Sequence, residues 1–170
     1  DARKRRKKRK GFRKLHDIVH VKSKAILSMH ITKGSRNDSP YLKMMLKSIP
    51  HGEGDFCLDR AYLSRMNCNL ITKKGRTPYI KPKSNTRVKA KGAQAWRSMI
   101  HLYRADREEF NRHYHKRSIS EVPYSVIKRV FGYTLTSIRW ITQRIELFIK
   151  VISYNIDIAI KDSVYQLYQG

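Results

Sequence analysis

The sequence is short of acidic residues. Its 170 residues include 13 Asp and Glu against 38 Lys and Arg, which leaves a formal charge of +25. Because self-repulsion of this size favours a polyanionic partner, we expect the chain to bind nucleic acid. A purely structural RNA binder would carry the same charge, so this deficit alone does not separate an enzyme from a scaffold.

Cysteine and long apolar runs are also scarce. Only Cys57 and Cys68 occur, without the CxxC spacing of a zinc site or the density of a secreted disulfide scaffold, so we expect a reducing compartment such as the cytoplasm. No signal peptide is visible, and the apolar stretch 135–160 is interrupted by Arg139, Arg144, Glu146, Lys150 and Asp157. We therefore expect an amphipathic core helix there and no membrane partner.

The chain starts at Asp1, and every residue from 3 to 10 is Lys or Arg. Such a block stays solvated until it meets an anion, so residues 1–11 are predicted to form a basic arm. A chain with 40% hydrophobic residues can bury a core, and we expect one domain over 12–133 with a C-terminal helix, 134–170, packed on it. Without an initiating methionine, the chain is expected to be a fragment or a trimmed protein.

Hydrophobic periodicity predicts the order of the elements. Alternation favours a β-hairpin over about 13–32, and helical spacing favours a helix over about 40–48. A short buried strand is predicted at 55–59 and a brief helix at 61–67. Residues 70–72 and 79–80 suggest one or two further strands, and helices are predicted from 93 onward, with turns near Ser118 and Gly132. This order indicates a mixed α/β fold with one sheet, at whose edge Asp59 and Glu121 would converge.

Four residues follow the order Tyr-x2-Arg-x3-Glu-x6-Lys: Tyr114, Arg117, Glu121 and Lys128. At about 100° per helical residue, their side chains would share one stripe in which an acid lies between cations and a phenol. Such a stripe suits a metal ion held beside a phosphate.

Glu121 has a structural alternative, because Ser118 to Glu121 matches a capping box. In that register Pro123 would fall at the fifth helical position, where it costs about 3 kcal/mol. With Ser120 as the cap, Pro123 lies in the first turn instead. We therefore prefer a functional role for Glu121.

The other acids have simpler explanations. Asp59 alone would be interpreted as the cap of the helix that starts near Ala61, Asp38 is predicted to cap a helix, and Asp17 is predicted to be a polar residue on a half-exposed strand. His113 and His115 form a lone His-x-His pair, which is more often solvated than metal-bound.

Between Lys73 and Lys91 there are eight cations and no acid. Within this stretch Lys81 and Lys83 flank Pro82 and are candidate phosphate contacts, with a solvated strand edge as the alternative.

The sequence resembles the transposases of bacterial and archaeal insertion sequences, which use an Asp-Asp-Glu metal triad on a ribonuclease H-like fold. The resemblance rests on the spaced signature within YHKRSISEVPYSVIKRVFG, on KLHDIVHVKSKAILSMHITKGSRNDSP, DFCLDRAYLSR and PYIKPK, and on a later helix with Gln143, Glu146 and YNI. It implies that Asp59 is the second aspartate of the triad and Glu121 its glutamate, that both bind Mg²⁺ or Mn²⁺, and that Tyr114, Arg117 and Lys128 contact the DNA ends.

One part of that pattern is missing. In the family's fold the first catalytic aspartate lies on a central strand before the hairpin, and Asp1 is the only acid upstream of it here. The resemblance therefore implies a sheet without its first strand, poor stability, and a chain that binds DNA without cutting it.

Three functions remain under consideration. The leading one is a DNA transposase, a homodimer when intact, that acts on element ends and target DNA. The alternatives are a non-catalytic basic nucleic-acid-binding protein and a metal-dependent nuclease without strand transfer.

Overall fold

The structure is a computed structural model, and it describes residues 12–89 and 91–169. The first element in this part of the chain is an antiparallel hairpin. Strand β1 (Arg13–Val19) pairs with β2 (Ile26–Lys33), which confirms the predicted hairpin. The register shifts between Ile18 and Val19, so Leu27 is an extra residue in β2. The predicted basic arm, residues 1–11, lies outside the described residues.

A second, parallel pair of strands follows. β3 (Asp55–Leu58) pairs with β4 (Thr77–Ile80), and the connection contains the 3₁₀ turn η2 (Arg60–Tyr62) and helix α2 (Arg65–Lys73). The strand predicted at 70–72 is wrong, because these residues belong to α2. Ser64 caps this helix by accepting a hydrogen bond from the Asn67 N–H at 3.1 Å, and Cys68 and Ile71 bury one face of it. The helix predicted at 61–67 is likewise divided between η2 and α2.

The chain therefore has a mixed α/β fold with two small sheets, where one sheet was expected. Among the described residues, β1 pairs only with β2, and β3 pairs only with β4. Between the sheets, the turn η1 (Ser39–Tyr41) and helix α1 (Leu42–Met45) occupy most of the predicted helix 40–48. Asp38 holds the cap position but forms no side-chain cap bond, and it forms an ion pair with Lys14 instead.

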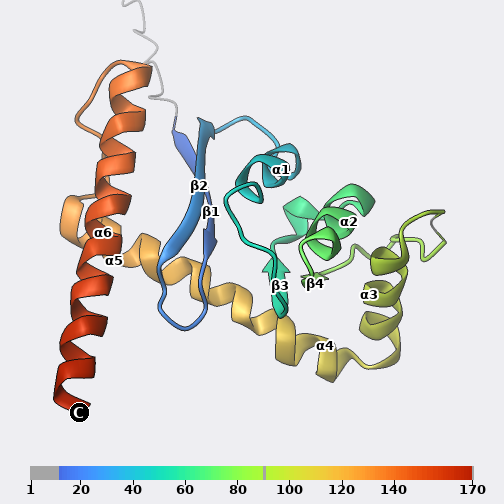
Figure 1. Cartoon of the computed structure of the whole chain (residues 1–170). Coiled ribbons are helices and arrows are strands. Elements are labelled where there is room, and N and C mark those ends of the chain that lie inside the picture. Colours follow the sequence, from blue (N-terminus) through green and yellow to red (C-terminus); the bar gives the residue numbers. More distant parts are fainter. Residues whose placement is uncertain (1–11, 90, 170) are drawn as a thin grey trace, which may run out of the picture.

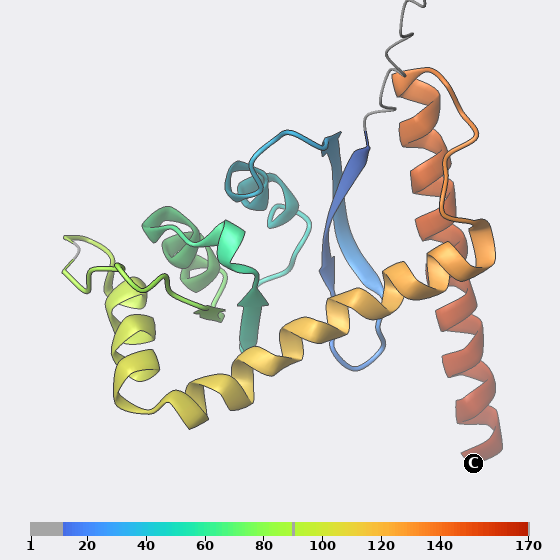
Figure 2. The same ribbon diagram turned by 180° about the vertical axis from the view of Figure 1, so that it is seen from behind.

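A nearly continuous helical segment joins the two sheets. After α3 (Gln94–Ala105) come α4 (Arg107–Tyr114), the 3₁₀ helix η3 (His115–Ser120) and α5 (Glu121–Phe131). Figure 2 shows this segment running across both sheets, and η3 contacts both β1 and β3. α5 ends where Gly132 adopts a φ of 80°, as the predicted turn there requires. Near Ser118 the chain forms a 3₁₀ helix.

Helix α6 (Trp140–Gln169) packs against β2 and α5 (Figure 1). The Tyr154 hydroxyl donates to the Lys24 carbonyl at 3.0 Å. The side-chain amide of Asn155 accepts from the Ile26 N–H at 2.9 Å and donates to the Ile26 carbonyl at 2.8 Å. One amide thus satisfies both backbone groups of Ile26 beside the irregular register. No helix in the described part is both long enough and apolar enough to cross a membrane.

Glu146 and Gln143 hold the loop that leads into α6. The Glu146 carboxylate accepts from the N–H groups of Thr136 and Ser137 and pairs with Lys150 at 3.1 Å. Burial alone would raise the pKa of Glu146, but these hydrogen bonds outweigh it and lower the pKa to about 2. Gln143 donates to the Ser137 carbonyl and accepts from Arg13 in β1. Gln143, Glu146 and Asn155 therefore attach α6 to β1, to the preceding loop and to β2.

Candidate functional site

A pocket of about 240 Å³ lies where β1, β3 and η3 meet. We call it the Asp59 pocket. It gathers four of the chain's acids, Asp17, Asp38, Asp55 and Asp59, together with the cations Lys14, Lys116 and Arg117. Other side chains that line it include His16, Tyr62, Cys57, Ile119 and Ser120.

Asp59 stands just beyond the end of β3, where it is exposed. Its Oδ1 accepts the Arg60 N–H at 2.7 Å and caps the turn η2, so the capping role considered above holds for one oxygen. No ion pair of the described residues involves Asp59. Its second oxygen, Oδ2, accepts no hydrogen bond within the described part of the chain, which leaves it available to a ligand.

Glu121 is the first residue of α5, and its side chain is 72% exposed. The capping box is not formed, because Ser118 donates its hydroxyl to the His115 carbonyl and the helix starts after Ser120. Glu121 Oε1 lies 3.8 Å from Arg117 Nη2. Ser120 lines the Asp59 pocket and Glu121 does not, so its carboxylate is beside the pocket rather than inside it.

The remaining members of the spaced signature lie at different distances from the pocket. Arg117 lines it, and its guanidinium carbon lies 5.9 Å from the centre of the Tyr114 ring. Tyr114 stacks on Phe110 with ring centres 5.7 Å apart; burial raises the pKa of its phenol, nearby Arg117 opposes this, and Asp59 adds to it. Lys128 is exposed on α5 and does not line the pocket.

The four residues therefore do not share one regular helix. Tyr114 ends α4, Arg117 lies in η3, and Glu121 and Lys128 belong to α5. Of the four, only Arg117 lines the Asp59 pocket, and Tyr114 and Glu121 are both near Arg117. Lys81 and Lys83 line a different pocket, together with Arg60.

The donor chemistry around Asp59 is suited to a hard cation. Asp59 and Glu121 both carry carboxylate oxygens without a strong partner, and Mg²⁺ binds through one or two carboxylates and several waters. Two-ion phosphoryl chemistry usually takes three carboxylates. Within residues 12–89 and 91–169, no group of three or more His, Cys, Asp and Glu is arranged to hold a metal ion.

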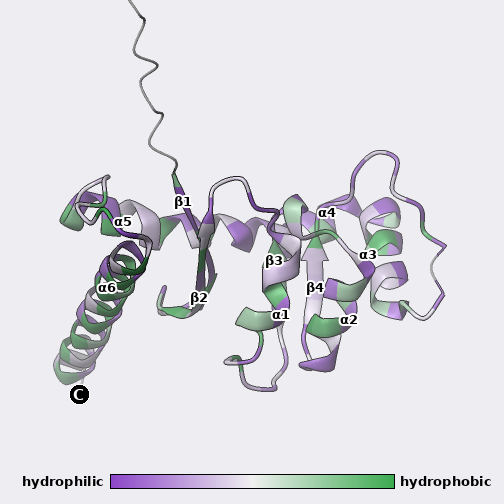
Figure 3. Cartoon of the chain, turned by 90° about the horizontal axis from the view of Figure 1, so that it is seen from above, coloured by the Kyte–Doolittle hydropathy of each residue, from purple (hydrophilic) through white to green (hydrophobic). Residues whose placement is uncertain are grey.

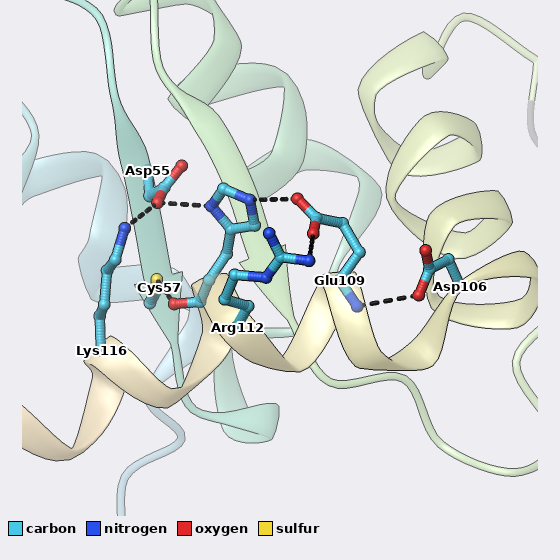
Figure 4. Close-up of polar contacts among 7 residues, drawn as sticks. Asp55, Cys57, Asp106, Glu109, Arg112 and Lys116 are labelled. Carbon is cyan, nitrogen blue, oxygen red and sulfur yellow. Dashed lines mark hydrogen bonds and ion pairs between the residues drawn. The ribbon is translucent and has the colours of Figure 1, made fainter.

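A cluster of two acids, a histidine and a lysine was not predicted from the sequence (Figure 4). His113 Nδ1 lies 2.7 Å from Asp55 Oδ2, and its Nε2 lies 2.9 Å from Glu109 Oε1. Lys116 donates to the same Asp55 oxygen at 2.6 Å, and the His113 ring stacks on Tyr79 at 4.6 Å. The prediction that His113 is solvated is therefore wrong, whereas His115 is exposed. The four-residue spacing of Glu109 and His113 was the available signal.

Within this cluster the acids and the cations stabilise each other's charged forms. Both carboxylates accept hydrogen bonds, so both nitrogens of His113 donate, which favours the imidazolium. Chiefly through Asp55 and then Glu109, this raises the pKa of His113 against the opposing effect of burial. Burial would raise the pKa of Asp55, but the hydrogen bonds from Lys116 and His113 lower it. Asp55 is thus committed to fastening α4 and η3 to β3.

Asp17 lies on the half-buried strand β1, as predicted, but one oxygen of its carboxylate is buried. Oδ1 accepts from the Tyr124 hydroxyl at 3.0 Å, while Oδ2 is buried with no hydrogen-bond partner among the described residues. Burial raises the pKa of Asp17 to about 6, although the Tyr124 hydrogen bond opposes this. Next to it, the fully buried His16 lies 2.9 Å from both Tyr62 Oη and Thr32 Oγ1, and burial lowers its pKa.

Comparison with known proteins gives one match. The family model for the transposase DDE domain matches residues 1–156, which is most of the chain. The searches of curated proteins and of solved structures found no match.

Proposed function

The chain belongs to the transposase DDE domain family, and we propose that it binds DNA at a transposable element's ends and at the target, with Asp59 and Glu121 as its metal-binding carboxylates. The observation that carries this proposal is the state of Asp59. In a chain of charge +25, this acid has no ion-pair partner among the described residues, has one oxygen without a hydrogen bond there, and shares its pocket with Arg117. A carboxylate that forms no ion pair, although cations are abundant, is available for a metal ion.

The roles of the residues follow from their positions. Asp59 and Glu121 would hold Mg²⁺ or Mn²⁺, which when bound activates the attacking oxygen and stabilises the leaving oxygen of a phosphodiester. Arg117, with five N–H donors on a fixed fork, would orient a phosphate at the pocket, and the Tyr114 ring supports the Arg117 guanidinium. Lys128, Lys81 and Lys83 would bind more distant phosphates of the same DNA.

We further propose that the two sheets are parts of one ribonuclease H-like sheet. The Asp59 pocket lies between β1 and β3, each of which pairs on one side only within the described chain. Asp17 Oδ2 lies at the same gap as a buried acceptor without a donor among the described residues. A strand seated between β1 and β3 would supply ladder partners, a donor for Asp17 and a place for the third carboxylate.

Because these residues provide two carboxylates, we expect the chain by itself to bind DNA without efficient cleavage. The test combines metal binding with a cleavage assay on labelled duplex DNA. Asp59→Asn and Glu121→Gln should each weaken Mn²⁺ binding by about tenfold or more, measured by electron paramagnetic resonance. Glu108→Gln, which removes an exposed acid of α4 away from the pocket, is the matched control.

The outcomes separate the candidate functions. If both variants bind Mn²⁺ as the parent does, the chain is better described as a non-catalytic basic nucleic-acid-binding protein. Efficient magnesium-dependent cleavage by the chain alone, without strand transfer, would favour the nuclease and would show that the set of carboxylates is wrong.

We also propose a homodimer, paired through α6. One face of this helix packs on the hairpin, while the other exposes an apolar stripe, which Figure 3 shows as green patches along α6: Ile141, Ile145, Phe148, Ile152, Ile156, Ile160, Val164 and Leu167. From Trp140 onward α6 carries three cations and three acids, so nucleic acid is not its natural partner. An antiparallel second copy centred on Ser153 would place Arg144 opposite the other copy's Asp162.

Sedimentation of the chain over a range of concentrations tests this pairing. The parent chain should be dimeric and Ile152→Glu monomeric, while Ile138→Glu, an exposed isoleucine before α6, should stay dimeric. A monomeric parent chain would overturn the pairing.

A further inference from the structure

In a second pocket, of about 450 Å³, every charged side chain of the lining is a cation. Arg60, Lys81, Lys83, Arg104 and Arg107 line it, together with neutral side chains, and no acid does. None of the ion pairs among the described residues involves any of these five. We call it the cation pocket. Five like charges brought together without a counter-charge repel one another, so the pocket has a charge that an anion would neutralise.

The loop that carries two of these cations is tied down. After β4 ends at Ile80, the Lys83 N–H donates to Thr86 Oγ1 at 2.9 Å. The Thr86 carbonyl accepts from the Arg104 guanidinium at 2.9 Å, and the Arg87 carbonyl accepts from Trp96 Nε1 at 3.1 Å. These bonds hold the loop against α3, so the lysines are positioned by the fold rather than spread along a free strand edge.

The two arginines that α3 and α4 supply are also positioned. Arg107 donates to the Tyr103 hydroxyl at 2.5 Å, and its guanidinium carbon lies 4.6 Å from the centre of the Tyr103 ring. Arg104 is held by the Thr86 carbonyl. Each guanidinium has five N–H donors, so most of them remain free for a ligand. Planar donors of this kind match the oxygens of a phosphate in pairs.

The position of the cation pocket next to the Asp59 pocket suggests which anion it takes. Arg60 lines it, and the preceding residue, Asp59, lines the Asp59 pocket. We propose that the cation pocket binds a backbone phosphate of the DNA strand that passes Asp59, with Arg104 and Arg107 as its main ligands. The choice of DNA as the source of the phosphate rests on the proposed function.

The test removes the two guanidinium charges and measures binding to duplex DNA over a range of salt concentrations. In the variant Arg104→Gln/Arg107→Gln, the slope of log affinity against log salt should become shallower by about 0.9 for each phosphate that the variant no longer neutralises. The matched control is Lys43→Gln/Lys47→Gln, which removes two exposed cations that line neither pocket. Circular dichroism verifies that both variants fold.

A second measurement uses inorganic phosphate as the probe. In titrations followed by NMR, the side-chain N–H signals of Arg104 and Arg107 should shift in a saturable way, ahead of the signals of Arg97, another exposed arginine of α3. Equal changes of slope in the two double variants, or shifts shared equally with Arg97, would overturn the phosphate site. That result would leave the proposed function standing, whereas a parent chain that binds no DNA would remove both.

Discussion

The Asp59 pocket and the cation pocket adjoin each other at Asp59 and Arg60, yet the first has charges of both signs and the second has cations alone. The first gathers four acids of a chain that has only 13, and three cations balance them. The second collects five cations and no acid. Under the proposed function, a metal ion at the first pocket would lie next to a phosphate in the second.

Inside the Asp59 pocket, the acids themselves differ. Asp55 has two cationic partners, and Asp17 has one buried oxygen without a partner among the described residues. Asp59 is exposed and has no ion-pair partner there, and only one of its oxygens accepts a hydrogen bond, from the Arg60 N–H. This comparison shows that the number of acids in a pocket does not by itself indicate a metal site. The candidate metal ligand is the acid that has no ion-pair partner, Asp59.

The largest effect on stability is expected at Asp17. Because burial raises its pKa to about 6 in the folded state, the protonated carboxyl is favoured there. The folded state therefore loses stability as the pH rises from the ordinary aspartate value of 3.8 to about 6, and the loss persists above that. Asp17→Asn should raise the free energy of unfolding by roughly 1–3 kcal/mol at about pH 8, with little change near pH 4.

Urea denaturation at the two pH values measures this difference. Asn keeps an oxygen that accepts the Tyr124 hydroxyl, so the hydrogen bond is preserved. An equal effect at the acidic and the alkaline pH would mean that the charge of Asp17 is not the cause.

A smaller effect of opposite sign is expected at Asp55. Asp55→Asn removes the charge that His113 and Lys116 share, and it should lower the free energy of unfolding by about 1–2 kcal/mol near pH 6. Asp59→Asn, four residues further along, should change it by less than about 0.5 kcal/mol, because Asp59 is exposed and has no ion-pair partner among the described residues. Similar losses in the two variants would erase the distinction between a structural acid and a free one.

The smallest effect is a pH dependence at His113. Its folded-state pKa is raised above the ordinary 6.5, so its contribution is complete below pH 6.5 and is lost as the pH rises through the folded value. The pKa of Asp55 is lowered, so its part is complete above pH 3.8 and is lost as the pH falls through its folded value. The two together contribute most between about pH 4 and 6.5.

His113→Gln should therefore cost stability chiefly in that window. Because the side chain is 28% exposed, we expect about 1 kcal/mol or less. Thermal unfolding of the parent chain and the variant at about pH 5.5 and about pH 8.5 measures the difference, and His115→Gln, an exposed neighbour, is the control. A cost that is independent of pH would point to the stacking on Tyr79 as the source of the stabilisation.

Several elements were predictable because their signals are local. The alternation over 13–32 depends on neighbouring residues, and so does the turn at Gly132, where a positive φ favours glycine. The segment 70–72 was not predictable in the same way, because Leu-Ile-Thr suits a strand or a buried helix. The cap at Ser64 and the burial of Ile71 decided for the helix.

The candidate site shows the same division. The spacing of Tyr114, Arg117, Glu121 and Lys128, together with the other matching segments, was enough to recognise the family, because such patterns are linear in the sequence. The pairing of Asp55 with His113 joins residues 58 positions apart, and no local signal records such a contact. No local signal records that Arg104 and Arg107 line one pocket together with Lys81 and Lys83.

The sequence by itself determined the excess of positive charge, the family, and most of the helices and strands, because composition and short-range periodicity are properties of neighbouring residues. The tertiary structure decided that the strands form two sheets with a pocket between them. It also decided which acids have partners. Whether a carboxylate is paired with a cation depends on side chains that folding brings from distant parts of the chain. Within the described residues, Asp55 is paired with His113, and Asp59 has no ion-pair partner.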